Sequence, residues 1–72
     1  MNIIYRKNTL YVYMNENIDK HNLSTMEERI NHIMGTYDID NLVINTYGND
    51  IEGLYEFENR YNSRHKSRVI IK

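Results

Sequence analysis

The feature that most constrains this fold is the alternation of strand-type and helix-type apolar patterns along the chain. Strand-like runs at 9–14, 41–46 and 69–71 are separated by segments with helical apolar spacing, over about 24–35 and 51–64. A strand joined to the next through a helix becomes a parallel neighbour, because the helix carries the chain back to the edge where the first strand began. The pattern therefore predicts three parallel strands linked by two crossover helices.

A further strand precedes these three and is expected to form a hairpin. Residues 3–6 are Ile-Ile-Tyr-Arg, and the following run alternates, with Leu10, Val12 and Met14 on one face. Lys7-Asn8 stands between the two runs, and Asn tolerates the positive φ that a tight two-residue turn requires. The first strand should therefore lie antiparallel to the second.

The first helix has recognisable signals at both ends. Residues 15–22 are polar and predict a loop, and Ser24-Thr25-Met26-Glu27 has the form of a capping box that would begin the helix. Gly35 is a natural C-terminal stop. Apolar residues follow the capping box at helical spacing: Met26, Ile30, Ile33, Met34 and Tyr37.

The second helix is expected over about 51–64, after a turn at Tyr47–Asp50. Leu54, Phe57 and Tyr61 recur at i, i+3 and i+7. The expected fold class is therefore α/β: a small mixed four-stranded sheet in β-β-α-β-α-β order, in a single domain over 1–72. Its two helices lie on one face if the two crossovers have the same hand.

Composition removes several classes of protein. With 72 residues and no Cys, the chain has no disulfide or thiolate zinc site. No apolar run approaches the roughly 18 residues of a membrane span, and the N-terminus lacks a secretory signal, so a cytoplasmic location is expected. A net charge of −1 argues against a dedicated nucleic-acid binder. There is no His-Glu-x-x-His, Gly-x-Ser-x-Gly or Gly-rich phosphate loop, so no metal, cofactor or enzymatic activity is expected.

Three segments together resemble the STAS domain, a family that includes bacterial anti-sigma factor antagonists. Ile18-Asp19 and His21 fit a Leu-Asp-His-His turn between the family's second strand and first helix. Residues 42–45 look like its central strand. Asp50-Ile51-Glu52-Gly53-Leu54 fits the family's Asp-Ser-Ser-Gly-Leu, and Arg60-Tyr61 follows Gly53 at the family's offset.

The resemblance implies a non-catalytic domain that docks a protein partner. In the family the partner is often an anti-sigma factor kinase or a larger scaffold of STAS domains. The residues that the resemblance assigns to partner binding are Asp19, His21, Asp50, Ile51, Glu52, Gly53 and Leu54. Family members continue into one or two further helices, so a chain ending after the last strand is expected to leave apolar surface open to a partner.

Glu52 departs from the family at an informative position. The second Ser of the motif is the residue that partner kinases phosphorylate, and Glu52 stands in its place. One interpretation is a permanently charged version, in which partner binding is constitutive. The other is that Glu is simply favourable in the first turn of a helix, in a capping pair with Asn49. Neither interpretation allows phosphorylation at this position.

Charge is unevenly distributed over the C-terminal part of the chain. Four acids and no bases lie between Asp50 and Glu58, and five bases and no acids lie between Arg60 and Lys72. This arrangement complements a helix dipole. Alternatively, Arg60, Arg64, Lys66 and Arg68, with Tyr61 nearby, form a basic patch of a nucleic-acid-associated or toxin-antitoxin-like protein. A third alternative is a structural homo-oligomer formed through the apolar strand at 69–71.

Overall fold

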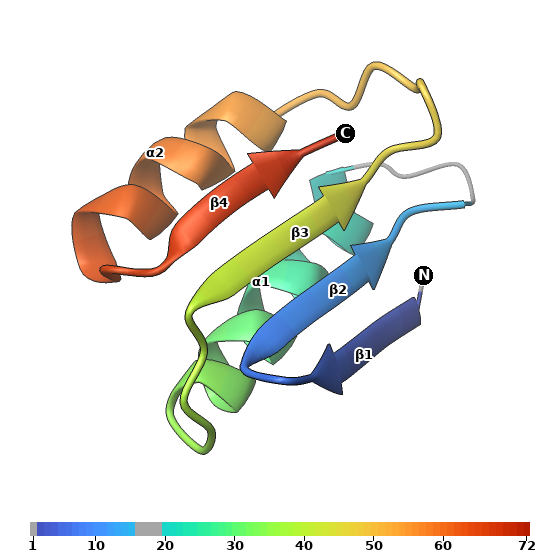
Figure 1. Cartoon of the computed structure of the whole chain (residues 1–72). Coiled ribbons are helices and arrows are strands. Elements are labelled where there is room, and N and C mark those ends of the chain that lie inside the picture. Colours follow the sequence, from blue (N-terminus) through green and yellow to red (C-terminus); the bar gives the residue numbers. More distant parts are fainter. Residues whose placement is uncertain (1, 16–19) are drawn as a thin grey trace.

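The computed structural model describes residues 2–15 and 20–72 and shows a two-layer α/β domain (Figure 1). A four-stranded mixed sheet forms one layer, and two helices form the other, in β-β-α-β-α-β order as predicted. Within the described ranges, no helix is long and apolar enough to cross a membrane. The elements are β1 (Asn2–Arg6), β2 (Thr9–Tyr13), α1 (Lys20–Met34), β3 (Asn41–Asn45), α2 (Leu54–Arg64) and β4 (Arg68–Ile71).

The predicted hairpin is confirmed in its detail. β1 and β2 pair antiparallel, and Arg6 lies opposite Thr9 at the end of the ladder. The two residues of the turn, Lys7 and Asn8, have φ values of 50° and 59°. A tight turn with two left-handed residues matches the twist of the flanking strands, which is why this short connection suffices.

The remaining three strands are parallel, as the crossover argument required. The sheet order is β1-β2-β3-β4, with β2 parallel to β3 and β3 parallel to β4. Both helices lie behind the sheet in Figure 1, so they cover one face only. β4 forms an edge of the sheet.

The core lies between the sheet and the two helices. Alternate strand residues point toward the helices, because successive side chains of a strand point to opposite faces. The buried hydrophobic residues are Leu10, Val12, Met14, Leu23, Met26, Ile30, Ile39, Leu42, Ile44, Ile51, Leu54, Phe57 and Tyr61.

Helix α1 begins earlier than the sequence predicted. It starts at Lys20, so the loop ends before His21, and the predicted capping box falls inside the helix. Ser24 is exposed within the second turn, and Glu27 bonds to a side chain of α2 instead. The reason is that Leu23 is buried and extends the apolar stripe backward by one turn, so core packing overrides a local capping signal.

Helix α2 begins later than predicted. Its first residue is Leu54, and Gly53 is the N-cap in the left-handed conformation, without a side-chain cap. Asp50 is therefore not the N-cap, and Glu52 is not in the first turn, so the expected helix-capping pair with Asn49 is wrong. Ile51 fits the apolar spacing that suggested a longer helix. In the structure it precedes the helix, and its side chain is buried there.

Tyr37 is the one residue of the predicted helical stripe that leaves the core. The helix ends at Met34, one residue before Gly35, as predicted. Tyr37 is 52% exposed, and its ring stacks on that of Tyr5, with the ring centroids 4.9 Å apart. A residue after the helix stop no longer follows helical periodicity, which explains the difference.

Candidate partner-binding surface

The segment Asp50–Leu54 is the last part of the connection from β3 into α2, and it alternates between anchoring and exposed side chains. Ile51 and Leu54 are buried, with exposures of 8% and 6%. The backbone N–H of Leu54 donates to the carbonyl of Ile51 at 3.3 Å, which closes a tight turn. Asp50 and Glu52 are exposed. The two apolar anchors therefore fix the backbone while the carboxylates face outward.

Gly53 holds this segment against the first helix. Its φ of 87° lies in the left-handed region, and a Cβ built there would be 3.0 Å from Cδ2 of Leu23. Its carbonyl accepts the backbone N–H of Phe57 at 3.0 Å. Any other residue would meet both backbone strain and a close contact. Gly53, assigned to partner binding by the resemblance, thus has a packing role in the structure.

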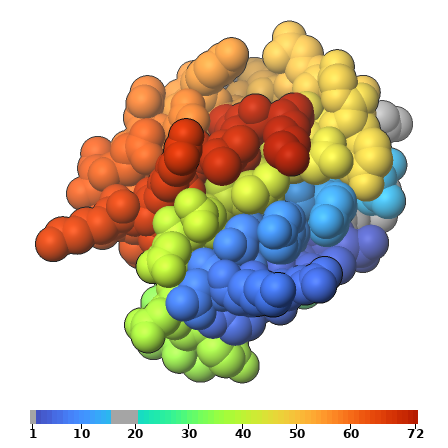
Figure 2. Space-filling view, viewed as in Figure 1, coloured from blue at the N-terminus to red at the C-terminus, as the bar shows by residue number. Residues whose placement is uncertain are grey.

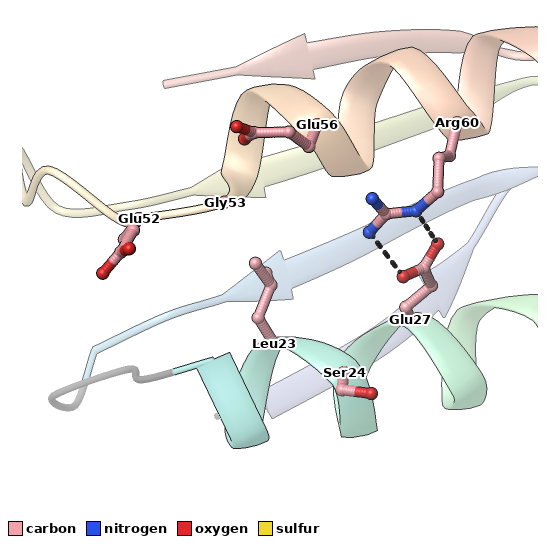
Figure 3. A pocket seen from close by; sticks show the side chains of 7 residues that line it. All are labelled: Leu23, Ser24, Glu27, Glu52, Gly53, Glu56 and Arg60. Carbon is pink, nitrogen blue, oxygen red and sulfur yellow. Dashed lines mark hydrogen bonds and ion pairs between the residues drawn. The ribbon is translucent and has the colours of Figure 1, made fainter.

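A groove of about 340 Å³ separates the two helices beside this segment (Figure 3). Glu52 and Glu56 supply carboxylates on the α2 side, and Leu23 lies at the floor near Gly53. We call Asp50, Glu52 and Glu56, which are all exposed, the acidic ridge. The residues that line the groove are Leu23, Ser24, Glu27, Glu52, Gly53, Glu56 and Arg60.

Arg60 closes the far end of the groove by an ion pair with Glu27. Its Nη2 donates to Oε1 at 2.8 Å, and its Nε donates to Oε2 at 3.0 Å. This bidentate hydrogen bonding lowers the pKa of the Glu27 carboxyl and raises that of the Arg60 guanidinium. The pair ties α1 to α2 across the groove.

A second groove, of about 420 Å³, lies on the other side of the segment, at the carboxyl ends of β3 and β4. Thr46 is buried there, and its hydroxyl donates to the carbonyl of Lys72 at 2.6 Å. Tyr55 is 76% exposed at the rim. The sequence could have indicated that Tyr55 is exposed, because this residue lies off the apolar stripe of α2. The lining residues are Thr46, Asn49, Asp50, Ile51, Leu54, Tyr55, Glu58 and Ile71.

The STAS resemblance also assigned Asp19 and His21, in the turn before the first helix, to partner binding. Asp19 lies outside the described residues. His21 lies in the first turn of α1, where its side chain is exposed, and not in a loop. The structure therefore brings the Asp50–Leu54 segment together with α1 at Leu23, a contact that the sequence did not indicate.

The predicted basic patch is divided among three elements. Arg60 is committed to Glu27, and Arg64, Lys66 and Arg68 lie on α2, on the connecting turn and on β4. Tyr61 is 2% exposed, and burial raises the pKa of its hydroxyl, so its ring is not available for stacking. The part of the prediction that placed Tyr61 at this patch is wrong.

The dipole interpretation of these charges has direct structural support. Glu56 lies in the first turn of α2, and Arg64 lies in the last turn. Each charge is therefore near the helix end that it stabilises.

The described residues of the ridge and its two grooves form an exposed surface that a partner could contact. Among residues 2–15 and 20–72, no three His, Cys, Asp or Glu side chains gather where they would hold a metal ion. The ridge and its two grooves present carboxylates, one exposed ring and short apolar stretches. Comparisons with protein-family models, with curated proteins and with solved structures found no match.

Proposed function

We propose that this chain is a non-catalytic protein-interaction domain of the STAS type that docks a partner through the acidic ridge. The observation that supports this most is the position of the ridge between two grooves, with Asp50 and Glu52 on a turn fixed by Ile51, Gly53 and Leu54 and with Glu56 in the first turn of α2. A segment held by buried anchors and flanked by two grooves can be enclosed by a complementary surface with little loss of conformational entropy.

Charge favours a basic partner surface. The ridge carries three exposed carboxylates, those of Asp50, Glu52 and Glu56. Lys or Arg side chains of a partner would find complementary charge there, which promotes association and fixes orientation. In keeping with the STAS resemblance, the proposed partner is an anti-sigma factor kinase or a STAS scaffold in the cytoplasm.

Glu52 makes this proposed contact constitutive. In the structure Glu52 is one residue before the N-cap of α2, where an anionic side chain lies near the positive end of the helix dipole. The family places a phosphorylatable Ser at this position. A Glu side chain holds its charge without a kinase, so we expect no release of the partner by phosphorylation.

Charge reversal tests the proposal. We would immobilise the wild type, Glu52→Arg and Glu28→Arg, and identify retained host proteins by quantitative mass spectrometry. Glu28 is the matched control, because it is exposed on α1 and lines a different surface. A partner retained by the wild type and Glu28→Arg but lost from Glu52→Arg supports the ridge. Equal retention by all three folded proteins would contradict it.

A second experiment tests the family relationship itself. Glu52→Ser restores the hydroxyl of the motif at an exposed position, so the fold should be unaffected. With the retained partner and ATP, phosphate transfer to the introduced hydroxyl is expected only if that partner is a kinase of the anti-sigma type. Absence of transfer from a partner with demonstrated kinase activity would argue against the STAS ancestry.

A further inference from the structure

The face of the sheet turned away from the helices is uncovered by any described element, and Figure 2 shows its strands at the molecular surface. Strand register fixes which side chains share this open face. Val12 and Ile44 point to the core, so Tyr11 and Val43 point the other way. One row across all four strands is Ile4, Tyr11, Val43 and Ile70, and the flanking residues are Asn2, Arg6, Thr9, Tyr13, Asn41, Asn45 and Arg68.

Two tyrosines form an aromatic platform in the middle of the open face. Tyr11 and Tyr13 are alternate residues of β2, an inner strand, and both are partly exposed. Their ring centroids are 6.4 Å apart, and the ring planes differ by only 15°. Neighbouring aromatic rings of similar orientation on a sheet offer successive stacking positions for flat ligands, such as unpaired bases.

Charge on the open face has one sign. Among the residues that the structure describes, the four strands contain no Asp or Glu, and their charged residues are Arg6 and Arg68. These two arginines begin and end the row that also contains Thr9 and Asn41. The described acids lie in helices and turns, so the net charge of −1 conceals a cationic sheet face.

From this combination we propose that the open face binds single-stranded nucleic acid. Bases would stack on Tyr11 and Tyr13, phosphates would pair with Arg6 and Arg68, and the amides of Asn2 and Asn41 lie on the same face as partners for base edges. This surface is separate from the acidic ridge, and the proposal does not depend on the function assigned to that ridge.

The same observations disfavour a second copy of the chain as the occupant. A face-to-face dimer would bring two open faces together, and neither supplies a strand carboxylate for Arg6 or Arg68. A charge buried without a partner is costly. A duplex is also disfavoured, because its bases are already stacked and present no free ring faces to the tyrosines.

Fluorescence anisotropy with labelled oligonucleotides of about 12 nucleotides tests the proposal, since this length exceeds a minimal single-strand site. The probes are single-stranded DNA, single-stranded RNA of the same sequence and the corresponding DNA duplex. We expect either single strand to bind more tightly than the duplex. We also expect the affinity to fall steeply between about 50 and 200 mM salt. Comparison of the DNA and RNA arms identifies the preferred strand.

Single substitutions test whether the nucleic acid binds at the open face. Tyr11→Thr and Tyr13→Thr should each weaken binding roughly tenfold, whereas Tyr11→Phe should retain it, because stacking needs the ring and not the hydroxyl. Arg68→Gln should weaken binding and lower the salt slope by about one. Tyr55→Thr and Arg64→Gln, which change an exposed ring and cation of α2, are the matched controls and should have little effect.

Several results would overturn the proposal. One is no binding of either single strand at about 50 mM salt, where ionic contacts are strong. Another is equal loss from Arg64→Gln and Arg68→Gln. A wild-type dimer in sedimentation that Tyr11→Thr converts to a monomer would show that the face joins two copies. If a Thr variant fails to fold by circular dichroism, the comparison of Arg68→Gln with Arg64→Gln still decides the matter.

Discussion

The two faces of the sheet differ in almost every chemical property, although they are built from the same four strands. On β3, Leu42 and Ile44 point to the helices and have no exposed surface, whereas Asn41, Val43 and Asn45 point away and are partly exposed. The covered face of the two inner strands is apolar throughout. The open face mixes tyrosine, asparagine and arginine with single aliphatic residues. The contrast teaches that one face supplies stability, which leaves the other available for recognition.

Charge follows the same division. The described carboxylates lie on the helices and connecting turns, including the acidic ridge, and the strands carry only arginine. A small domain with a net charge near zero can therefore present surfaces of opposite sign on different sides. The predictions below test how strictly stability belongs to the covered side, from the largest expected effect to the smallest.

Phe57 is expected to be the most sensitive position of the covered layer. It is 1% exposed and is the largest fully buried side chain. Phe57→Ala should lower the free energy of unfolding by about 3–5 kcal/mol, measured by urea denaturation, because it leaves a cavity in the core. Tyr55→Ala removes an exposed ring from the same helix and should change it by less than about 0.5 kcal/mol. If both variants lost a similar amount of unfolding free energy, stability would not depend on the covered side as the comparison states.

Two adjacent residues of β3 compare the faces directly. Ile44→Thr places a hydroxyl in the core and should lower the free energy of unfolding by about 2–3 kcal/mol. Val43→Thr makes a similar change on the open face and should cost less than about 1 kcal/mol, since Thr retains β-branching. Thermal denaturation followed by circular dichroism measures both. A Val43→Thr loss as large as that of Ile44→Thr would mean that the open face is part of the core.

Replacing three glycines by Ala should separate the effect of backbone strain on stability from the effect of packing. Gly53→Ala should lower the free energy of unfolding by about 1–2 kcal/mol through its left-handed φ, and further through the contact with Leu23. Gly48→Ala has a φ of 78° but open space around it, so only the strain contributes. Gly35→Ala should be neutral or slightly stabilising. If Gly48→Ala and Gly53→Ala had equal effects in urea denaturation, Leu23 would not hold the turn.

The ion pair between Glu27 and Arg60 should have the smallest effect, because the Arg60 side chain is exposed to water, which weakens the attraction between the two charges. The folded state lowers the pKa of Glu27 from 4.5, so its contribution is present above that pH and is lost as the pH falls through the folded value. Glu27→Gln should therefore destabilise the protein slightly at neutral pH and less in acid. Glu28→Gln is the exposed control. A difference in the urea midpoint that grew on acidification would contradict the assignment.

Local signals in the sequence were reliable where neighbours along the chain decide the conformation. The Lys7-Asn8 turn, the stop at Gly35 and the apolar spacing of Leu54, Phe57 and Tyr61 all predicted what the structure shows. They failed at the helix starts. A capping box at Ser24 and an apolar residue at Ile51 were each outweighed by packing with a distant element, which the local pattern does not contain.

The candidate surfaces were predictable to different degrees. Asp50–Leu54 emerged as a unit from its motif, and the structure adds the anchoring of Ile51 and the contact of Gly53 with Leu23. The sequence did not indicate that Arg60 of the predicted basic patch pairs with Glu27, a residue 33 positions earlier in the chain. Spacing along one helix gives no information about a partner on another.

The sequence by itself determined the order of the elements, the hairpin and the apolar side of each strand and helix, because these depend on periodicity and turn chemistry within a few residues. Only the tertiary structure decided which residues meet. Strand register aligned Ile4, Tyr11, Val43 and Ile70 into one row and placed Arg6 and Arg68 in another. The physical reason is that register and helix packing minimise the exposed apolar area of the whole chain, a quantity that no single segment specifies.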